Sequence, residues 1–283
     1  MKEVTLSQGT IRYRDDGTGE PLVFVHGLLV SGRLWEHVAE RLAPDFRCIV
    51  PDLPLGCHTS PMAADADLSP PGVARLLLEF LDALGLDRVT LVGNDSGGAI
   101  SQLVATSAPE RVGRLILTNC DAYDNFPPKL FGYFKPVARI PGGLNALTQS
   151  MRVKPLRRTP IAFGVLTKKR LPGELLDEWL RPGMESGEIR KDTRKFILGT
   201  DPAQTEQAAR DLESFRSPTL FAWAPEDRWF KIEHAERLAA SMPDARIVRI
   251  PDAKTFVSLD QPEKLAEAIA GFISETKPVA AAA

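Results

Sequence analysis

The stretch Val89-Thr-Leu-Val-Gly-Asn-Asp95-Ser-Gly-Gly98 decides the fold of this chain. An apolar run typical of a buried strand passes directly into a Gly-x-Asp-x-Gly turn, and a helical pattern follows the turn. Gly93 and Gly97 bracket Asp95, whereas a turn centred on Ser96 would need a small residue at position 94, where asparagine stands. The stretch therefore predicts a sharp strand–turn–helix elbow that presents the Asp95 carboxylate at the carboxyl end of a strand.

Short apolar segments on both sides of the elbow predict the rest of a sheet. They are rich in Val, Ile and Leu and do not alternate with polar residues, which is typical of strands buried on both faces of a parallel sheet. Helical patterns separate them, the clearest after Ser69 and before Gly85. Their order predicts an α/β fold, with an eight-stranded, mostly parallel sheet and helices on both faces. The predicted strands are 3–6, 10–14, 21–26, 47–51, 89–93, 114–119, 219–224 and 246–251.

Residues 121–214 interrupt this order, because they contain many prolines between short helical patterns and no convincing strand. We predict that they form a helical cap over one end of the sheet. The core is then made of residues 1–120 and 215–276, and the tail 277–283 is expected to be unstructured.

The first half of this insertion is basic. From Asn125 to Gly173 it has no Asp or Glu but ten Lys and Arg residues, Arg157 and Arg158 among them. Two interpretations stay open: the charges form a solvated helical face, or their field attracts an anionic substrate.

The composition excludes several classes of protein. The chain has 283 residues, of which 43% are hydrophobic and 25% charged, and a net charge of −2, as in an ordinary globular protein. Its odd number of cysteines (Cys48, Cys57 and Cys120) argues against a secreted disulfide framework, and neither a signal-peptide pattern nor an apolar run of membrane-spanning length is present. We expect a cytoplasmic monomer or homodimer that binds a small-molecule substrate, neither nucleic acid nor membrane, and needs no cofactor or metal.

Together with the elbow, two further motifs give the chain a resemblance to the α/β-hydrolase fold over nearly its whole length. The pair His26-Gly27 resembles the family's oxyanion loop, and Phe221-Ala-Trp-Ala-Pro-Glu-Asp227 resembles the segment that carries the acid of the catalytic triad. The resemblance implies that Asp227 is this acid. It also implies an oxyanion hole made of the backbone N–H groups of Leu28 and Ser96.

An aspartate at the elbow resembles the haloalkane dehalogenases and epoxide hydrolases, in which the carboxylate attacks carbon and forms an ester intermediate. Two features depart from that pattern. Ser96 and Leu28 stand where dehalogenases usually carry Trp and often Asn to hold the halide, which disfavours dehalogenation. Thr255 aligns with the catalytic histidine, and no histidine follows His234. The usual base for hydrolysing the ester is therefore missing.

His58 is the first candidate to replace this base, because its loop leaves the same sheet edge as Asp95. Lys254 either faces solvent or stabilises the Asp95 carboxylate. Asp121 and Asp124 follow the sixth predicted strand, where some dehalogenases place their acid, and are second choices for that role. The residues expected to face the substrate are His26, Asn94, Asp121, Tyr123, Lys254 and Thr255.

Three functions follow from these residues and stay open here. The first is hydrolysis of a small organic molecule, with Asp95 as nucleophile and an atypical base. The second is a lyase, isomerase or cyclase reaction in which Asp95 acts as general base. The third is ligand binding without catalysis. A covalent adduct on Asp95, turnover without an adduct, and binding alone would distinguish the three.

Overall fold

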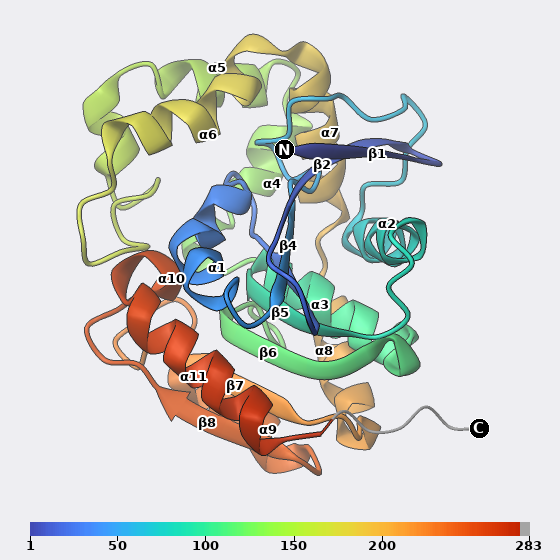
Figure 1. Cartoon of the computed structure of the whole chain (residues 1–283). Coiled ribbons are helices and arrows are strands. Elements are labelled where there is room, and N and C mark those ends of the chain that lie inside the picture. The colour runs from blue at the N-terminus through green and yellow to red at the C-terminus, as the bar shows by residue number, and fades with distance from the viewer. Residues whose placement is uncertain (278–283) are drawn as a thin grey trace.

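Eight strands form one sheet within residues 1–277, the part of the chain that this computed structural model describes (Figure 1). Their order is β1-β2-β4-β3-β5-β6-β7-β8. β1 pairs antiparallel with β2 and β2 with β4, and every further pair is parallel. The predicted eight-stranded, mostly parallel sheet is confirmed. The strands are β1 (Lys2–Leu6), β2 (Gly9–Asp16), β3 (Pro21–Val25), β4 (Arg47–Pro51), β5 (Val89–Asp95), β6 (Val112–Cys120), β7 (Thr219–Trp223) and β8 (Ala245–Arg249).

Both faces of the sheet are buried, which explains why its strands do not alternate in sequence. Leu22 and Phe24 of β3 join an apolar cluster with side chains of α1 (Glu36–Leu42) and α11 (Pro262–Glu275). Val23 and Val25 point to the opposite face and join a cluster with α2 (Pro70–Ala83) and α3 (Ser96–Ser107). Successive residues of a strand face opposite sides, so an apolar side chain is needed at every position.

Helix α2 begins and ends at the residues that the sequence indicates. The Ser69 hydroxyl accepts the backbone N–H of Gly72 at 3.3 Å, and Pro70 is the first helical residue. Gly85 follows the helix with a φ of +64°, a conformation that glycine adopts without strain. Within residues 1–277, the remaining α-helices outside the insertion are α9 (Ile232–Ser241) and α10 (Val257–Asp260).

The chain between β6 and β7 is helical and contains no strand, all of it lying in the described part of the chain. Helices α5 and α6 lie at the top of the molecule in Figure 1, beyond the end of the sheet. Helix α8 differs, because it packs against α3 of the core although the sequence-based boundaries assign it to the cap. The helices are α4 (Phe134–Arg139), α5 (Gly143–Ser150), α6 (Gly173–Glu185), α7 (Gly187–Gly199) and α8 (Pro202–Asp211).

The basic half of the insertion is not a uniform charged surface. Arg157 is buried, where its Nε donates to the carbonyl of Met151 and its guanidinium pairs with Asp177. Lys168 pairs with Glu226 of the core. Arg157 is therefore a structural cation and not part of a field that attracts anions, which corrects the second interpretation for this residue.

None of the helices within residues 1–277 is long and apolar enough to cross a membrane. Of the predicted tail 277–283, only Lys277 belongs to the described residues.

Candidate active site

Asp95 stands at the turn between β5 and α3. Its φ of 54° and ψ of −133° lie outside the regions that residues with a side chain ordinarily adopt. Its carboxylate oxygen Oδ1 accepts the backbone N–H of Ser96 at 2.7 Å and the Ser96 hydroxyl at 3.3 Å. The other oxygen, Oδ2, accepts no hydrogen bond within residues 1–277. The start of α3 thus holds one oxygen of Asp95 and leaves the second free.

Two glycines let the elbow approach the end of β3. A Cβ atom on Gly27 would lie 2.5 Å from Oδ2 of Asp95, so this carboxylate lies directly against the backbone that follows His26. A Cβ atom on Gly97 would lie 2.3 Å from the carbonyl oxygen of Val25. Only glycine leaves room for the backbone and carboxylate at these positions. The carboxylate is therefore held between the end of β3 and the start of α3.

Thr255 and Asp227 meet beside the elbow. The Thr255 hydroxyl donates to Oδ2 of Asp227 at 2.6 Å, and Oδ1 of Asp227 accepts the N–H groups of Trp229 and Phe230 at 2.8 and 3.2 Å. Burial raises the pKa of Asp227, although these hydrogen bonds oppose the shift. A hydroxyl has no basic nitrogen, so Thr255 cannot take a proton from water as a histidine in its place would.

Asp121 follows β6 and lies next to Asp95. Its backbone N–H donates to the carbonyl of Asp95 at 3.4 Å, and its side chain is fully buried. Burial raises the pKa of Asp95 to about 7, and the charge of Asp227 adds to the shift. Burial also raises the pKa of Asp121 well above its usual value, and the Asp95 charge raises it further. In both residues burial favours the protonated carboxyl over the carboxylate.

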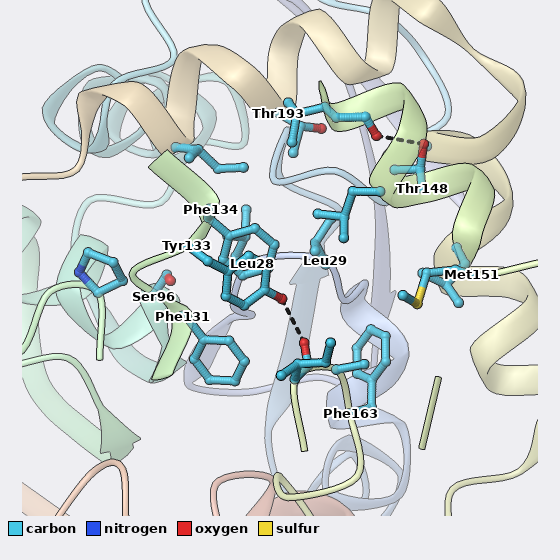
Figure 2. Close-up of a pocket in the computed structure, with 18 of the residues that line it drawn as sticks. Leu28, Leu29, Ser96, Phe131, Tyr133, Phe134, Thr148, Met151, Phe163 and Thr193 are labelled. Atoms are coloured by element: carbon cyan, nitrogen blue, oxygen red, sulfur yellow. Dashed lines mark hydrogen bonds between the residues drawn. The ribbon is translucent and has the colours of Figure 1, made fainter. Parts of the chain in front are cut away.

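An apolar cavity lies between the core and the insertion, and Asp95 is among the residues that line it. Figure 2 shows side chains of its wall. Leu28 and Ser96 contribute to its wall where it meets the elbow, and Tyr133 donates its hydroxyl to the carbonyl of Ile161 at 2.6 Å. The charged residues in its lining are Asp95 and Arg190, and the Arg190 guanidinium donates to the carbonyl of Gly183 at 2.8 Å. Most of the wall is made of aromatic and aliphatic side chains, among them Leu29, Phe131, Phe134, Met151 and Phe163. A cavity of this kind suits an uncharged, apolar molecule better than an anion.

His58 lies outside this site, which corrects its assignment as the replacement base. Its Nε2 lies 3.2 Å from Oδ2 of Asp192 in α7, and its Nδ1 accepts the backbone N–H of Gly56 at 3.4 Å. It is buried and does not line the cavity. Both ring nitrogens are occupied, so His58 connects its loop to α7 and has no nitrogen free for a substrate.

His26 and Asn94 support the backbone around the site and do not face the substrate. Nε2 of His26 accepts the N–H of Leu53 at 2.9 Å, so Nδ1 carries the proton and donates to the carbonyl of Gly27, also at 2.9 Å. Burial lowers the pKa of His26 to about 4, and the ring is neutral. The Asn94 amide donates to the carbonyl of Thr255 at 2.7 Å. This bond ties the Thr255 loop to the elbow.

Tyr123 and Lys254 also lie away from the cavity, contrary to expectation. The guanidinium carbon of Arg237 lies 3.9 Å from the centre of the Tyr123 ring, so this ring packs on the side of α9. The charge of Lys254 lowers the pKa values of Asp227 and Glu226, and it is not among the causes that shift Asp95. Lys254 therefore acts on Asp227 and Glu226, and it is not among the residues that line the cavity.

The sequence did not indicate the residues of the insertion that form the cavity wall. Phe131, Phe134 and Phe163 come from segments without a regular apolar period, so nothing in their pattern shows which side chains converge. The sequence did not indicate Asp192 either, because its partner His58 is more than a hundred residues away in the chain and no local pattern relates the two. The long run without acidic residues was the signal that this segment differs from the core.

Comparison with known protein families gives one match that spans most of the chain. Residues 20–262 match the family model described as alpha/beta hydrolase fold. Haloalkane dehalogenase 2 of Mycobacterium tuberculosis (strain ATCC 25618 / H37Rv) is 30% identical over 276 residues, which cover 93% of this chain and 91% of the relative. A 2-hydroxy-6-oxo-6-phenylhexa-2,4-dienoate hydrolase of Burkholderia cepacia is 26% identical, covering 89% of this chain and 86% of the relative.

Solved structures show the same fold. The epoxide hydrolase CorEH superposes with a TM-score of 0.81 at 20% identity, covering 97% of this chain and 98% of that structure. A thermophilic esterase from Thermogutta terrifontis superposes with a TM-score of 0.76 at 24% identity, covering 97% and 99%. At these identities the likeness concerns the arrangement of the elements.

Proposed function

The chain belongs to the alpha/beta hydrolase fold family, and from this premise we propose that it hydrolyses a small, uncharged organic molecule through an ester on Asp95. One observation carries the proposal. The N–H of Ser96 holds Oδ1 of Asp95 while Oδ2 stays free at the floor of an apolar cavity. A carboxylate held in this way is oriented for attack on a carbon atom of a bound substrate.

The chemistry takes two steps. Oδ2 of ionised Asp95 attacks a saturated carbon atom, the bond from this carbon to the leaving atom breaks, and its electron pair stays on the leaving atom. Water then adds to Cγ of the ester, and the N–H groups of Ser96 and Leu28 stabilise the resulting oxyanion. Collapse releases the alcohol and restores the Asp95 carboxylate. The second step needs a base, and Thr255 does not provide one.

The helices between β6 and β7 would act as the cap of this site. We assign residues 127–197 this role, because the helices α4 to α7 together with the loops before and between them make most of the cavity wall. The core contributes Leu28, Leu29, Asp95 and Ser96. The core would then comprise residues 1–120 and 215–276 together with α8, which packs against α3.

A second candidate function is supported by the protonation of Asp95. A pKa of about 7 is near that of an efficient general base at neutral pH. A lyase, isomerase or cyclase reaction would need only this carboxylate and a preorganised cavity, and it would not need the missing histidine. Such an enzyme would move a proton at Asp95 and form no ester.

A single turnover in oxygen-18 water distinguishes these functions. The protein in excess would be mixed with styrene oxide or 1-bromohexane, digested, and the peptide containing Asp95 analysed by mass spectrometry. Ester formation followed by hydrolysis places oxygen-18 in the Asp95 carboxylate, and a stalled ester adds the mass of the alkyl group. Turnover with neither change would contradict the nucleophile and favour the general base. Asp95→Asn is the control and should show neither modification.

A further inference from the structure

Three large apolar side chains are exposed within one short segment of the insertion. Val153 is 55% exposed, Leu156 37% and Ile161 55%, and they are half of the large apolar side chains that are exposed within residues 1–277. Their segment, residues 152–161, lies between α5 and α6, and Figure 1 shows the chain between these two helices along the outer edge of the molecule. Exposed apolar side chains that gather in one place are typical of a surface that binds a partner.

The backbone of this segment holds two of these side chains on one side. Residues Lys154–Arg158 form a 3₁₀ helix, in which side chains three residues apart lie one above the other. The N–H of Leu156 donates to the carbonyl of Val153 at 2.9 Å, so these two residues are related in this way. Arg157 is buried and pairs with Asp177 of α6. This ion pair fixes the segment to the protein, while Val153 and Leu156 stay in solvent.

The charge around these side chains is positive. Arg152 and Lys154 are exposed in the same segment, and the wider stretch 125–173 contains no acidic residue. The Arg152 side chain donates to an uncharged glutamine. Lys154 lies 4.0 Å from a carboxylate oxygen of Asp177, and this carboxylate also pairs with the buried Arg157. The segment therefore combines exposed apolar side chains with an excess of positive charge.

The segment also borders the cavity that Asp95 lines. Ile161 is exposed to solvent and is itself part of the cavity lining, and its carbonyl accepts the Tyr133 hydroxyl at 2.6 Å (Figure 2). Phe131 and Tyr133 line the cavity as well, and both are half-buried. The cavity wall thus reaches the surface of the protein at Ile161, five residues after Leu156.

We propose that the segment 152–161 is a docking surface for a lipid bilayer that contains anionic lipids. Its apolar side chains enter the layer between head groups and acyl chains, and Arg152 and Lys154 contact the lipid phosphates. A second protein fits this surface less well, because the centre of a protein interface is depleted of charged residues, whereas an anionic bilayer attracts cations.

Binding of this kind is peripheral. It departs from the sequence-based expectation of no membrane contact, which considered only the net charge of the chain and runs of membrane-spanning length. It does not rest on the proposed function, because it needs neither the Asp95 carboxylate nor turnover.

Vesicle flotation tests the docking surface with the full chain. Vesicles of phosphatidylcholine mixed with phosphatidylglycerol are the probe, and vesicles of phosphatidylcholine alone measure the part played by charge. We expect wild type to bind the mixed vesicles more tightly than the uncharged ones. Raising the salt concentration from about 0.1 M to about 1 M should weaken this preference, because it shortens the screening length. Failure of wild type to bind the mixed vesicles would overturn the proposal.

Two double variants separate the apolar contribution from the charged one. Val153→Ser combined with Leu156→Ser should weaken binding to the mixed vesicles about tenfold or more, because two apolar side chains no longer enter the bilayer. Neither residue lines the cavity, so the cavity wall is unchanged. Arg152→Gln combined with Lys154→Gln should weaken binding about tenfold on the mixed vesicles and leave binding to phosphatidylcholine alone unchanged.

Matched controls use exposed residues of the core. Val248→Ser removes an exposed apolar side chain of β8, and Lys231→Gln combined with Lys264→Gln removes two exposed positive charges. Both should bind the mixed vesicles as wild type does. Equal losses in the controls and in the variants of the segment would overturn the docking surface, because binding would then not depend on this segment.

Sedimentation velocity without vesicles examines a second copy of the chain as the occupant. A dimer that dissociates in Val153→Ser with Leu156→Ser, together with no binding of vesicles, would show that two copies cover the segment and would overturn the proposal. Asp95→Asn should bind the mixed vesicles as wild type does. Vesicle binding by a wild type that forms no ester on Asp95 would support the docking surface and contradict the proposed function, and an ester without vesicle binding would do the reverse.

Discussion

The hydroxyl of Thr255 donates a 2.6 Å hydrogen bond to Oδ2 of Asp227, and this pair stands beside the elbow that carries Asp95. A histidine at position 255 would have Asp227 available to orient its ring. We therefore expect Thr255→His to convert a stable alkyl ester on Asp95 into turnover. The Thr255 side chain is fully buried, so the larger imidazole ring needs room at this position. We expect the double variant Lys254→Gly with Thr255→His to accommodate the ring better than Thr255→His alone.

The rate at which the hexyl ester disappears, followed by intact-protein mass spectrometry, measures this gain. A positioned base should increase it about 10²-fold or more. Asp227→Asn in the same background is the control, since the introduced ring would lose its orienting partner. An ester equally stable with and without the histidine would show that position 255 does not reach the reacting atoms.

The same pair should contribute to stability. Thr255→Val keeps the shape of the side chain but removes the donor, so Oδ2 of Asp227 is left buried without it. We expect the free energy of unfolding, from urea titration, to fall by about 1–3 kcal/mol. Ser258→Ala is a matched control three residues further on, because the buried Ser258 hydroxyl has no partner. Equal losses in both variants would contradict a specific role for the hydrogen bond.

Asp95 should make the fold less stable as pH rises. Its pKa of about 7 in the folded protein exceeds the ordinary value of 3.8, so the folded state binds a proton that the unfolded chain releases between these two values. Asparagine does not titrate. The thermal midpoint of Asp95→Asn should therefore exceed that of wild type by an amount that grows from pH 4 to pH 7 and reaches ~5 °C. A difference that does not change with pH would show that Asp95 is ionised without cost.

Arg157 should matter for stability and not for attraction of a substrate. Arg157→Glu would place a second carboxylate beside Asp177 in a buried position, and we expect it to lower the free energy of unfolding by about 3 kcal/mol. Arg152→Glu is the control, because Arg152 is an exposed cation of the same segment whose side chain donates to Gln149. Similar losses in the two variants, measured by thermal unfolding, would contradict the structural role of Arg157.

The sequence alone determined the elbow, the strands and the two-sided burial of the sheet. These features follow from local patterns: Gly93 and Gly97 around Asp95, and apolar runs without alternation between helical stripes. The role of Asp227 as the acid of the triad was implied by the resemblance of the segment 221–227 to the α/β-hydrolase fold.

Only the tertiary structure decided which side chains meet. Three features join residues that no local period relates: the proximity of Asp121 to Asp95, the pairing of Arg157 with Asp177, and the pairing of His58 with Asp192. The sequence pattern assigned His58 and Arg157 to function, but the side chains of both are paired inside the fold. Whether a charged residue is buried and paired depends on how α4 to α8 pack. A charged side chain needs no partner on the surface, whereas in the interior it is tolerated only when it is paired.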